Sequence, residues 1–141
     1  MIKKNNNTKY KLVISGSRNI SDSTILDKAL IYYSIKPENI SQIICDDSFG
    51  VSKHAVWFAE KNNIKYKVFP IEWSNLEDKP LFIKENQHGE YNAAAPFVTA
   101  QKMIDVGDSI LMVISDYEST TCDKLIELAK NKNMKIFIYE M

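Results

Sequence analysis

Five short apolar runs, rich in β-branched and aromatic residues, alternate along the chain with segments of helical periodicity. Such runs are typical of strands, and they cover residues 11–15, 41–45, 65–69, 109–115 and 135–139. Most of them are almost continuously apolar, which predicts strands that are covered on both faces. Apolar residues at helical spacing predict helices over 23–34, 52–62 and 120–132, and a weaker pattern predicts one over 98–106.

Strands that alternate with helices are joined by right-handed crossovers and form a mainly parallel sheet. The sequence therefore predicts an α/β fold, a three-layer Rossmann-like domain with a mainly parallel five-stranded sheet. We expect residues 1–141 to form a single domain, since this length suits one hydrophobic core. Residues 73–96 follow neither pattern, and so long an irregular segment predicts a lid, a hairpin or an oligomer contact.

Charge and hydropathy exclude several classes of partner. The 18 basic and 18 acidic residues balance to a net charge of zero, so the chain lacks the basic footprint of a nucleic-acid-binding protein. The start of the chain is polar, and the longest apolar run, 110–114, is far shorter than the roughly 20 residues of a membrane span. We expect a cytoplasmic protein that binds neither nucleic acid nor a membrane.

The cysteines and histidines are too few and too scattered to indicate a metal centre. Cys45 and Cys122 do not form a CxxC pair, and we expect both to be reduced, partly buried thiols. His54 is expected on the solvated face of a helix rather than as a catalytic base, and His88 stands apart from it. The sequence predicts no metal and no cofactor.

The loop after the first expected strand reads SGSRNISD, residues 15–22. Ligands of such sheets bind beyond the carboxyl ends of the strands, where this loop lies. Gly16 permits a close backbone approach, Ser17 offers a hydroxyl, and Arg18 offers a planar fork for a phosphate or a base near a helix N-terminus. Arg18 is the single arginine of a lysine-rich chain, which favours a role that lysine cannot fill.

The loop after the second expected strand opens with two aspartates, Asp46 and Asp47. Unit charges 4 Å apart interact by roughly 4 kcal/mol at a dielectric constant near 20, so these carboxylates oppose a bare phosphate about as strongly as Arg18 attracts it. They could accept hydrogen bonds from a base or from ribose hydroxyls, bind Mg²⁺, or stabilise the positive start of the next helix. The sequence leaves these alternatives open.

Three segments in this order resemble a known family: VISGSR, then GVSKHAVWFAEKNNIKYKVFPIEW, then APFVTAQKMIDVGDSILMVISDYESTT. Together they are similar to the small YspA- and YpsA-related proteins of the SLOG superfamily, relatives of DNA-processing protein A and of the Lonely Guy fold. The resemblance spans about residues 11–140. It implies a Rossmann-like fold that binds a nucleotide or a nucleotide-derived ligand.

Carried over residue by residue, the resemblance also implies where the ligand would bind. This chain departs from the family at the GGAR stretch, replaced by Asp46 to Phe49, and at the glycine of the last loop, replaced by Thr120. The arginine and asparagine of the family's IRN stretch are Thr99 and Ala100. The predicted ligand-binding residues are Gly16, Ser17, Arg18, Asp46, Asp47, Ser48, Phe49, Gly50, Trp73, Asp116, Ser119, Thr120 and Thr121.

Aromatic residues at expected strand ends, Phe49, Trp73 and Tyr117, could stack on a nucleobase. Phe49 is the first choice, because it stands where the family has arginine. The chain retains Gly16 to Arg18 of the first loop, but the phosphate-binding positions of the second loop are replaced. This combination favours non-catalytic binding of a nucleotide-derived small molecule, by a sensor or a sequestering protein. An NAD-derived immune signal in phage–host conflict is one candidate ligand.

Two alternatives remain from the sequence. A divergent nucleotide N-glycosidase or phosphoribohydrolase would use Asp116 or Glu118 as its base. A protein-interaction module with a degenerate pocket would use residues 73–96, and we expect a homo-oligomer. No catalytic residue is assigned.

Overall fold

The computed structural model describes residues 9–115 and 120–141. The elements of these ranges are, in order, β1 (Tyr10–Gly16), α1 (Ile25–Tyr32), a 3₁₀ turn (Pro37–Asn39), β2 (Ile40–Asp46), α2 (Val51–Lys61), β3 (Tyr66–Phe69), β4 (Ile83–Asn86), β5 (Gly89–Asn92), α3 (Ala95–Val106), β6 (Ser109–Ile114), α4 (Thr120–Asn131) and β7 (Lys135–Glu140).

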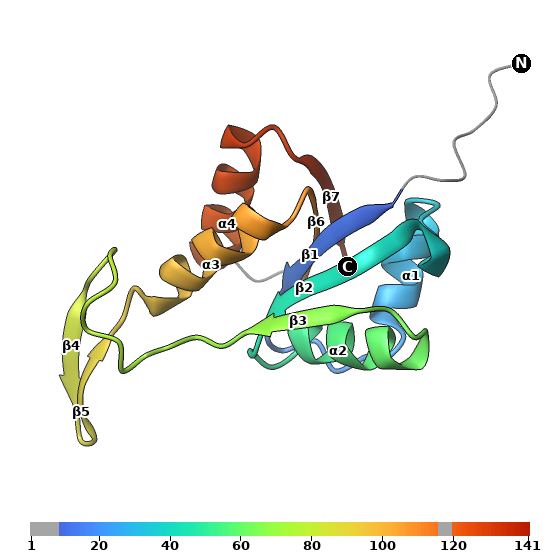
Figure 1. Ribbon diagram of the computed structural model, residues 1–141. Helices are drawn as coiled ribbons and strands as arrows, with labels where there is room; N and C mark the ends of the chain where they lie inside the picture. Colours follow the sequence, from blue (N-terminus) through green and yellow to red (C-terminus); the bar gives the residue numbers. More distant parts are fainter. Residues whose placement is uncertain (1–8, 116–119) are drawn as a thin grey trace, which may run out of the picture.

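Five of the strands form one sheet in the order β3-β2-β1-β6-β7, and every neighbouring pair is parallel (Figure 1). The predicted fold class is confirmed, and each predicted strand of this sheet ends within one residue of the observed one. The chain builds β1, β2 and β3 towards one edge and then returns to add β6 and β7 on the other side of β1. The strand order therefore reverses between β1 and β6, which is where ligands of such sheets bind.

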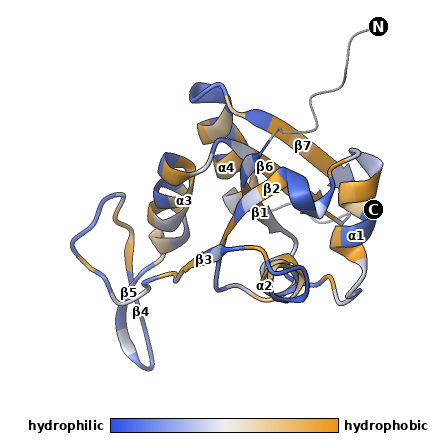
Figure 2. Ribbon diagram, turned by 45° about the vertical axis from the view of Figure 1, so that its right-hand side comes forward, coloured by the Kyte–Doolittle hydropathy of each residue, from blue (hydrophilic) through white to orange (hydrophobic). Residues whose placement is uncertain are grey.

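Helices cover both faces of this sheet and make three layers. Leu12 and Ile14 of β1 pack in a core with residues of α1 and α2, whereas Val13 between them packs with residues of α3 and α4. All three side chains are fully buried, as the continuous apolar pattern of the strand predicts. The hydrophobic colour in Figure 2 gathers on the sheet and the helices that cover it.

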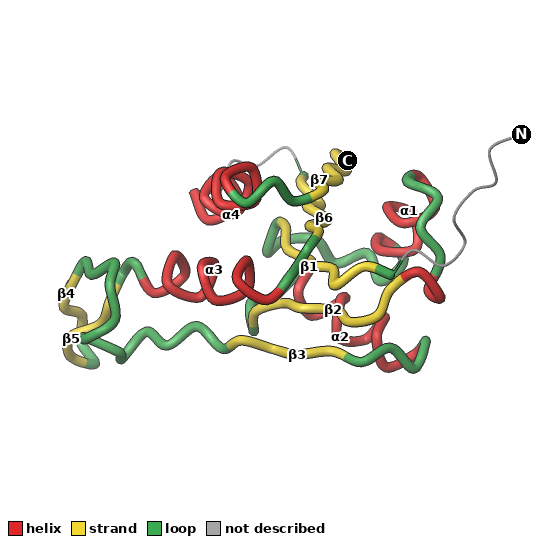
Figure 3. The backbone as a smooth tube through the Cα atoms, turned by 45° about the horizontal axis from the view of Figure 1, so that its top comes forward, coloured by secondary structure: helices red, strands yellow, loops and turns green. Residues whose placement is uncertain are grey.

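Within residues 73–96 the structure contains a two-stranded antiparallel hairpin, β4–β5, which projects away from the sheet (Figures 1 and 3). Asn92, which is 1% exposed, fixes its base. Its Oδ1 accepts hydrogen bonds from the backbone N–H groups of Phe82 (2.9 Å) and Ala94 (3.0 Å), and its own N–H donates to the Trp73 carbonyl (2.7 Å). A hairpin is thus one of the three forms that the sequence allowed for this segment.

Two further features bear on the sequence-based expectations. Cys45 and Cys122 are both buried, and burial, reinforced by the charge of Asp46, raises the pKa of the Cys45 thiol to about 12. The thiol of Cys45 is therefore protonated at neutral pH and is a poor nucleophile.

None of the helices in residues 9–115 and 120–141 combines the length and the apolar character needed to cross a membrane.

Candidate functional site

A cavity of about 410 Å³ opens at the carboxyl edge of the sheet, where the strand order reverses. Small-molecule sites commonly enclose about 300–1,000 Å³. The loops after β1, β2 and β3 and the first turns of α2, α3 and α4 contribute to its wall. Six predicted site residues line it, namely Gly16, Arg18, Asp46, Ser48, Trp73 and Thr121.

The loop after β1 is folded tightly onto the end of β6. The backbone N–H of Ser17 donates to the Val113 carbonyl (3.0 Å), and its Oγ accepts a hydrogen bond from the backbone N–H of Ser115 (3.0 Å). Ser17 is 2% exposed and does not line the cavity, so its hydroxyl holds the loop. Arg18 is exposed at the cavity, and within the described residues it makes no hydrogen bond or ion pair.

The same loop is held from the other side by His54 of α2. We expected His54 on a solvated face, and this was wrong, because the loop crosses α2 and leaves the imidazole 6% exposed. Its Nε2 lies 3.0 Å from the Ile20 carbonyl oxygen, and its ring meets that of Trp57 edge-on. His54 therefore fixes the backbone two residues beyond Arg18 and contributes nothing to the cavity wall.

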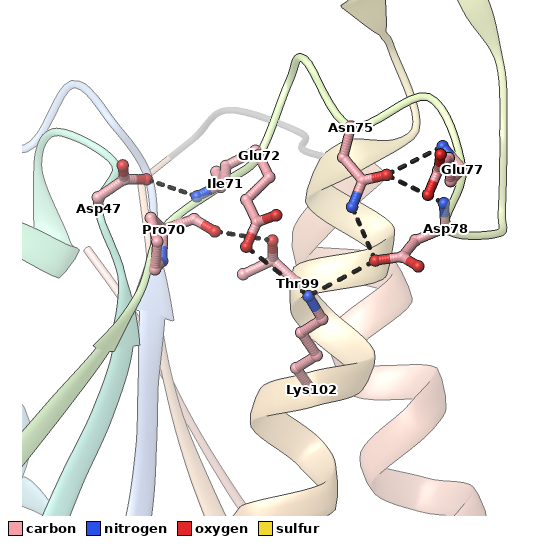
Figure 4. Close-up of polar contacts among 9 residues, drawn as sticks. All are labelled: Asp47, Pro70, Ile71, Glu72, Asn75, Glu77, Asp78, Thr99 and Lys102. Atoms are coloured by element: carbon pink, nitrogen blue, oxygen red, sulfur yellow. Dashed lines mark hydrogen bonds and ion pairs between the residues drawn. The ribbon is translucent and has the colours of Figure 1, made fainter.

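The two aspartates after β2 have different surroundings. Asp46 is 5% exposed, lines the cavity, and accepts a hydrogen bond on Oδ1 from the backbone N–H of Ser48 (2.9 Å). Asp47 is exposed and accepts a hydrogen bond from the backbone N–H of Ile71 (3.0 Å), which ties this loop to the segment after β3 (Figure 4). Of the two aspartates, only Asp46 therefore lines the cavity.

The second oxygen of Asp46 is open to the cavity. Among the described residues, His54 Nδ1 is the one fully buried side-chain N or O atom without a hydrogen-bond partner. Asp46 Oδ2 makes no hydrogen bond to a described residue and is not among these fully buried atoms, so with respect to the described residues it is accessible from the cavity that Asp46 lines. A carboxylate oxygen of a buried residue is thus free to accept hydrogen bonds from a ligand.

Phe49 and Gly50 of the second loop do not line the cavity. Phe49 is 75% exposed and lies outside the cavity wall. Gly50 precedes α2 with φ 75°, and the adjacent Val51 N–H donates to the Ser17 carbonyl (3.3 Å). Gly50 therefore joins the first and second loops through the backbone.

The segment after β3 carries Trp73 to the cavity, and a polar network anchors it to α3 (Figure 4). Lys102 of α3 lies 3.9 Å from both Glu72 and Asp78, and Thr99 donates to the Pro70 carbonyl at 3.5 Å. Thr99 is 3% exposed, and its hydroxyl is bound to the chain's own backbone.

Sequence reasoning missed seven residues of the cavity wall. Phe97 is the most informative, because α3 begins at Ala95 and not near residue 98, which places this aromatic ring in the first turn beside the cavity. Pro96 was the available signal, since proline is favoured in the first turn of a helix. The seven residues are Ser15, Asn19, Ser52, Ala93, Pro96, Phe97 and Cys122.

The last predicted loop lies partly beyond what the structure describes. Asp116, Tyr117, Glu118 and Ser119 lie outside the described residues. Thr120 begins α4, with no description of its side chain, and Thr121 lines the cavity.

The described part of the wall balances one cation, Arg18, against one carboxylate, Asp46, and adds two aromatic rings and several hydroxyl groups. Such a wall suits a polar ligand of low net charge with a planar part. Within residues 9–115 and 120–141 there is no cluster of three histidine, cysteine, aspartate or glutamate side chains that could hold a metal ion.

The chain matches no protein-family model, and comparison with curated proteins and with solved structures gives no significant match.

Proposed function

We propose that this chain binds a nucleotide-derived small molecule in the cavity at the carboxyl edge of the sheet and does not convert it. The observation that carries the proposal is the composition of the wall. Arg18, which makes no hydrogen bond or ion pair to a described residue, lies on the same cavity as Asp46 and the rings of Trp73 and Phe97. These groups are complementary to an anion, to hydroxyl or amino donors, and to a base, respectively.

The described part of the wall has few groups that could act as an acid or a base, which favours binding without turnover. Cleavage of a glycosidic bond draws on a general acid or base, often a pair of carboxyl groups. In the described part of the wall, Asp46 is the one carboxylate, and no histidine or lysine is present. The alternative enzyme would depend on Asp116 or Glu118, outside the described residues, and its signature would be release of free base.

Thermal unfolding against a ligand panel tests the proposal. The panel contains nucleoside monophosphates, NAD, ADP-ribose and cyclic ADP-ribose isomers, the last two representing NAD-derived immune signals. A ligand at 100 times its dissociation constant adds about 2.7 kcal/mol of stability, which raises the unfolding midpoint by several degrees in a domain of this size. Chromatography of the same mixtures should recover the ligand intact.

Arg18→Ala is expected to weaken binding of any ligand found in this way by about 10-fold or more, because it removes charge-assisted hydrogen bonds of roughly 1.5–3 kcal/mol. Lys53→Ala is the matched control, since it removes the same charge from an exposed position of α2 that does not line the cavity. Titration calorimetry measures both variants. Equal affinities of wild type and Arg18→Ala would contradict a role of Arg18 at the site.

We also propose that the β4–β5 hairpin forms a contact between two copies of the chain. Two-stranded hairpins are marginal on their own, and exposed apolar groups mark interaction surfaces. Within the described residues, β4 and β5 pair only with each other. At its base, Leu81, Phe82 and Ile83 are 37%, 59% and 46% exposed.

Sedimentation measures this association directly. We expect the wild type to sediment at twice the chain mass of 16.2 kDa, and Phe82→Ser to shift it towards the monomer because the mutation removes apolar contact area. Ile31→Ser is the control, as Ile31 is 75% exposed on α1, remote from the hairpin in the sequence. A monomeric wild type over the whole concentration range would refute this contact.

A further inference from the structure

The position of Asp46 along the sheet edge indicates which part of a nucleotide it would meet. The strands that end at the cavity follow the order β3-β2-β1, and neighbouring strands lie about 4.8 Å apart. Arg18 follows β1, Asp46 is the last residue of β2, and Trp73 follows β3. Asp46 therefore belongs to the middle strand, between the strand followed by the cation and the strand followed by the indole ring.

A nucleotide has the same linear order of chemical groups. Its phosphate and its base are joined through the ribose, which carries hydroxyl groups on the side away from the base. With the phosphate at Arg18 and the base against Trp73 and Phe97, the ribose lies over the end of β2. The residue that β2 presents at the cavity is Asp46, whose Oδ2 makes no hydrogen bond to a described residue.

The chemistry of a buried carboxylate suits this position. Carboxylates only accept hydrogen bonds, whereas the 2′- and 3′-hydroxyls of ribose can donate them. In dinucleotide-binding sheets an acidic residue after the second strand binds the ribose 2′-hydroxyl in this way. A 2′-phosphate at the same place would meet a like charge in a largely buried setting.

We propose that Asp46 recognises the ribose hydroxyls of the ligand, so that the cavity selects ribonucleotides with a free 2′-hydroxyl over 2′-deoxynucleotides. This inference rests on the proposed function and narrows its ligand class. It also separates the two aspartates of the loop, because Asp47 does not line the cavity and has no such role.

Titration calorimetry with matched ligand pairs tests the inference. The pairs are the 5′-monophosphates of adenosine, guanosine, cytidine and uridine and ADP-ribose, each with its 2′-deoxy counterpart. The wild type should bind the ribose form of the bound pair at least about 10-fold more tightly, the effect of one charge-assisted hydrogen bond. Asp46→Asn should reduce this ratio to below about 3 and leave the affinity for the 2′-deoxy form equal or higher, since it removes a negative charge beside the phosphate.

Two controls keep the result interpretable. Asparagine at position 46 retains an oxygen that can accept the Ser48 N–H bond, so the unliganded variant should unfold at nearly the wild-type temperature. Asp47→Asn makes the same charge change one residue further and should keep the wild-type ratio.

The outcomes separate this inference from the proposed function. Equal binding of ribose and 2′-deoxy forms by the wild type, or an unchanged ratio in Asp46→Asn, would overturn the ribose inference and leave nucleotide binding intact. Failure of every pair to bind, together with no thermal shift from NAD or cyclic ADP-ribose isomers, would overturn both.

Discussion

Gly16→Ala is expected to lower the midpoint of thermal unfolding by roughly 10 °C. A Cβ atom at this position would lie 2.0 Å from the carbonyl oxygen of Val113, the paired residue of β6, and 2.8 Å from a methyl group of Val51. The first of these neighbours is a backbone atom of the sheet, and moving it would disturb the pairing of β1 with β6. An overlap of this kind costs about 3 kcal/mol, and each kcal/mol corresponds to roughly 3–4 °C in a domain of this size.

Ser15→Ala is the control for Gly16→Ala, because it changes the preceding residue of β1 and adds no atom. Calorimetric melting of the unliganded proteins compares the two variants. A loss of less than about 1 kcal/mol for Gly16→Ala would mean that β1 and β6 can separate to admit a methyl group, contrary to the tight register of these central strands.

The second large effect is expected at Gly50, and a comparison with Gly89 isolates its cause. Both glycines have positive φ angles, 75° and 112°, so alanine strains the backbone at either position. At Gly50 the new Cβ would also lie 2.4 Å from the Ser17 carbonyl oxygen, whereas at Gly89 it would meet no atom within 4 Å. Gly50→Ala should therefore destabilise the protein by about 2 kcal/mol more than Gly89→Ala, in the range of overpacking.

Urea unfolding measures this difference, and titration calorimetry adds a second reading. The overlap at Gly50 displaces the backbone of Ser17 and Arg18, so Gly50→Ala should also weaken ligand binding, while Gly89→Ala should not. Equal losses of stability in the two variants would show that only backbone strain matters and that the first and second loops are not in close contact.

The architecture was predictable because its signals are local. Continuous apolar runs mark strands buried on both faces, and helical spacing marks the helices between them, so the parallel sheet follows from the order of elements. The weakest helix prediction, 98–106, began three residues late because the first residues of α3, Ala95 to Phe97, are too few to show a helical period. That shift concealed the position of Phe97.

The candidate site was predictable only to the level of loops. The carboxyl-edge rule identified the loops after β1, β2 and β3, and these do meet at the cavity. Within them, neighbouring residues diverge: Arg18 lines the cavity while Ser17 is buried against β6, and Asp46 lines it while Phe49 is exposed outside. The type of a residue alone does not predict which of two neighbours lines the cavity.

The sequence by itself determined the strands, the helices and the edge at which a ligand would bind, because short-range periodicity and the handedness of crossovers set them. Tertiary structure alone decided that, of two adjacent aspartates, Asp46 lines the cavity and Asp47 instead ties the loop to the backbone of Ile71. It also decided that His54 is buried, since the loop after β1 packs across α2. These outcomes depend on contacts between segments far apart in the chain, and such contacts leave no periodic trace in the sequence.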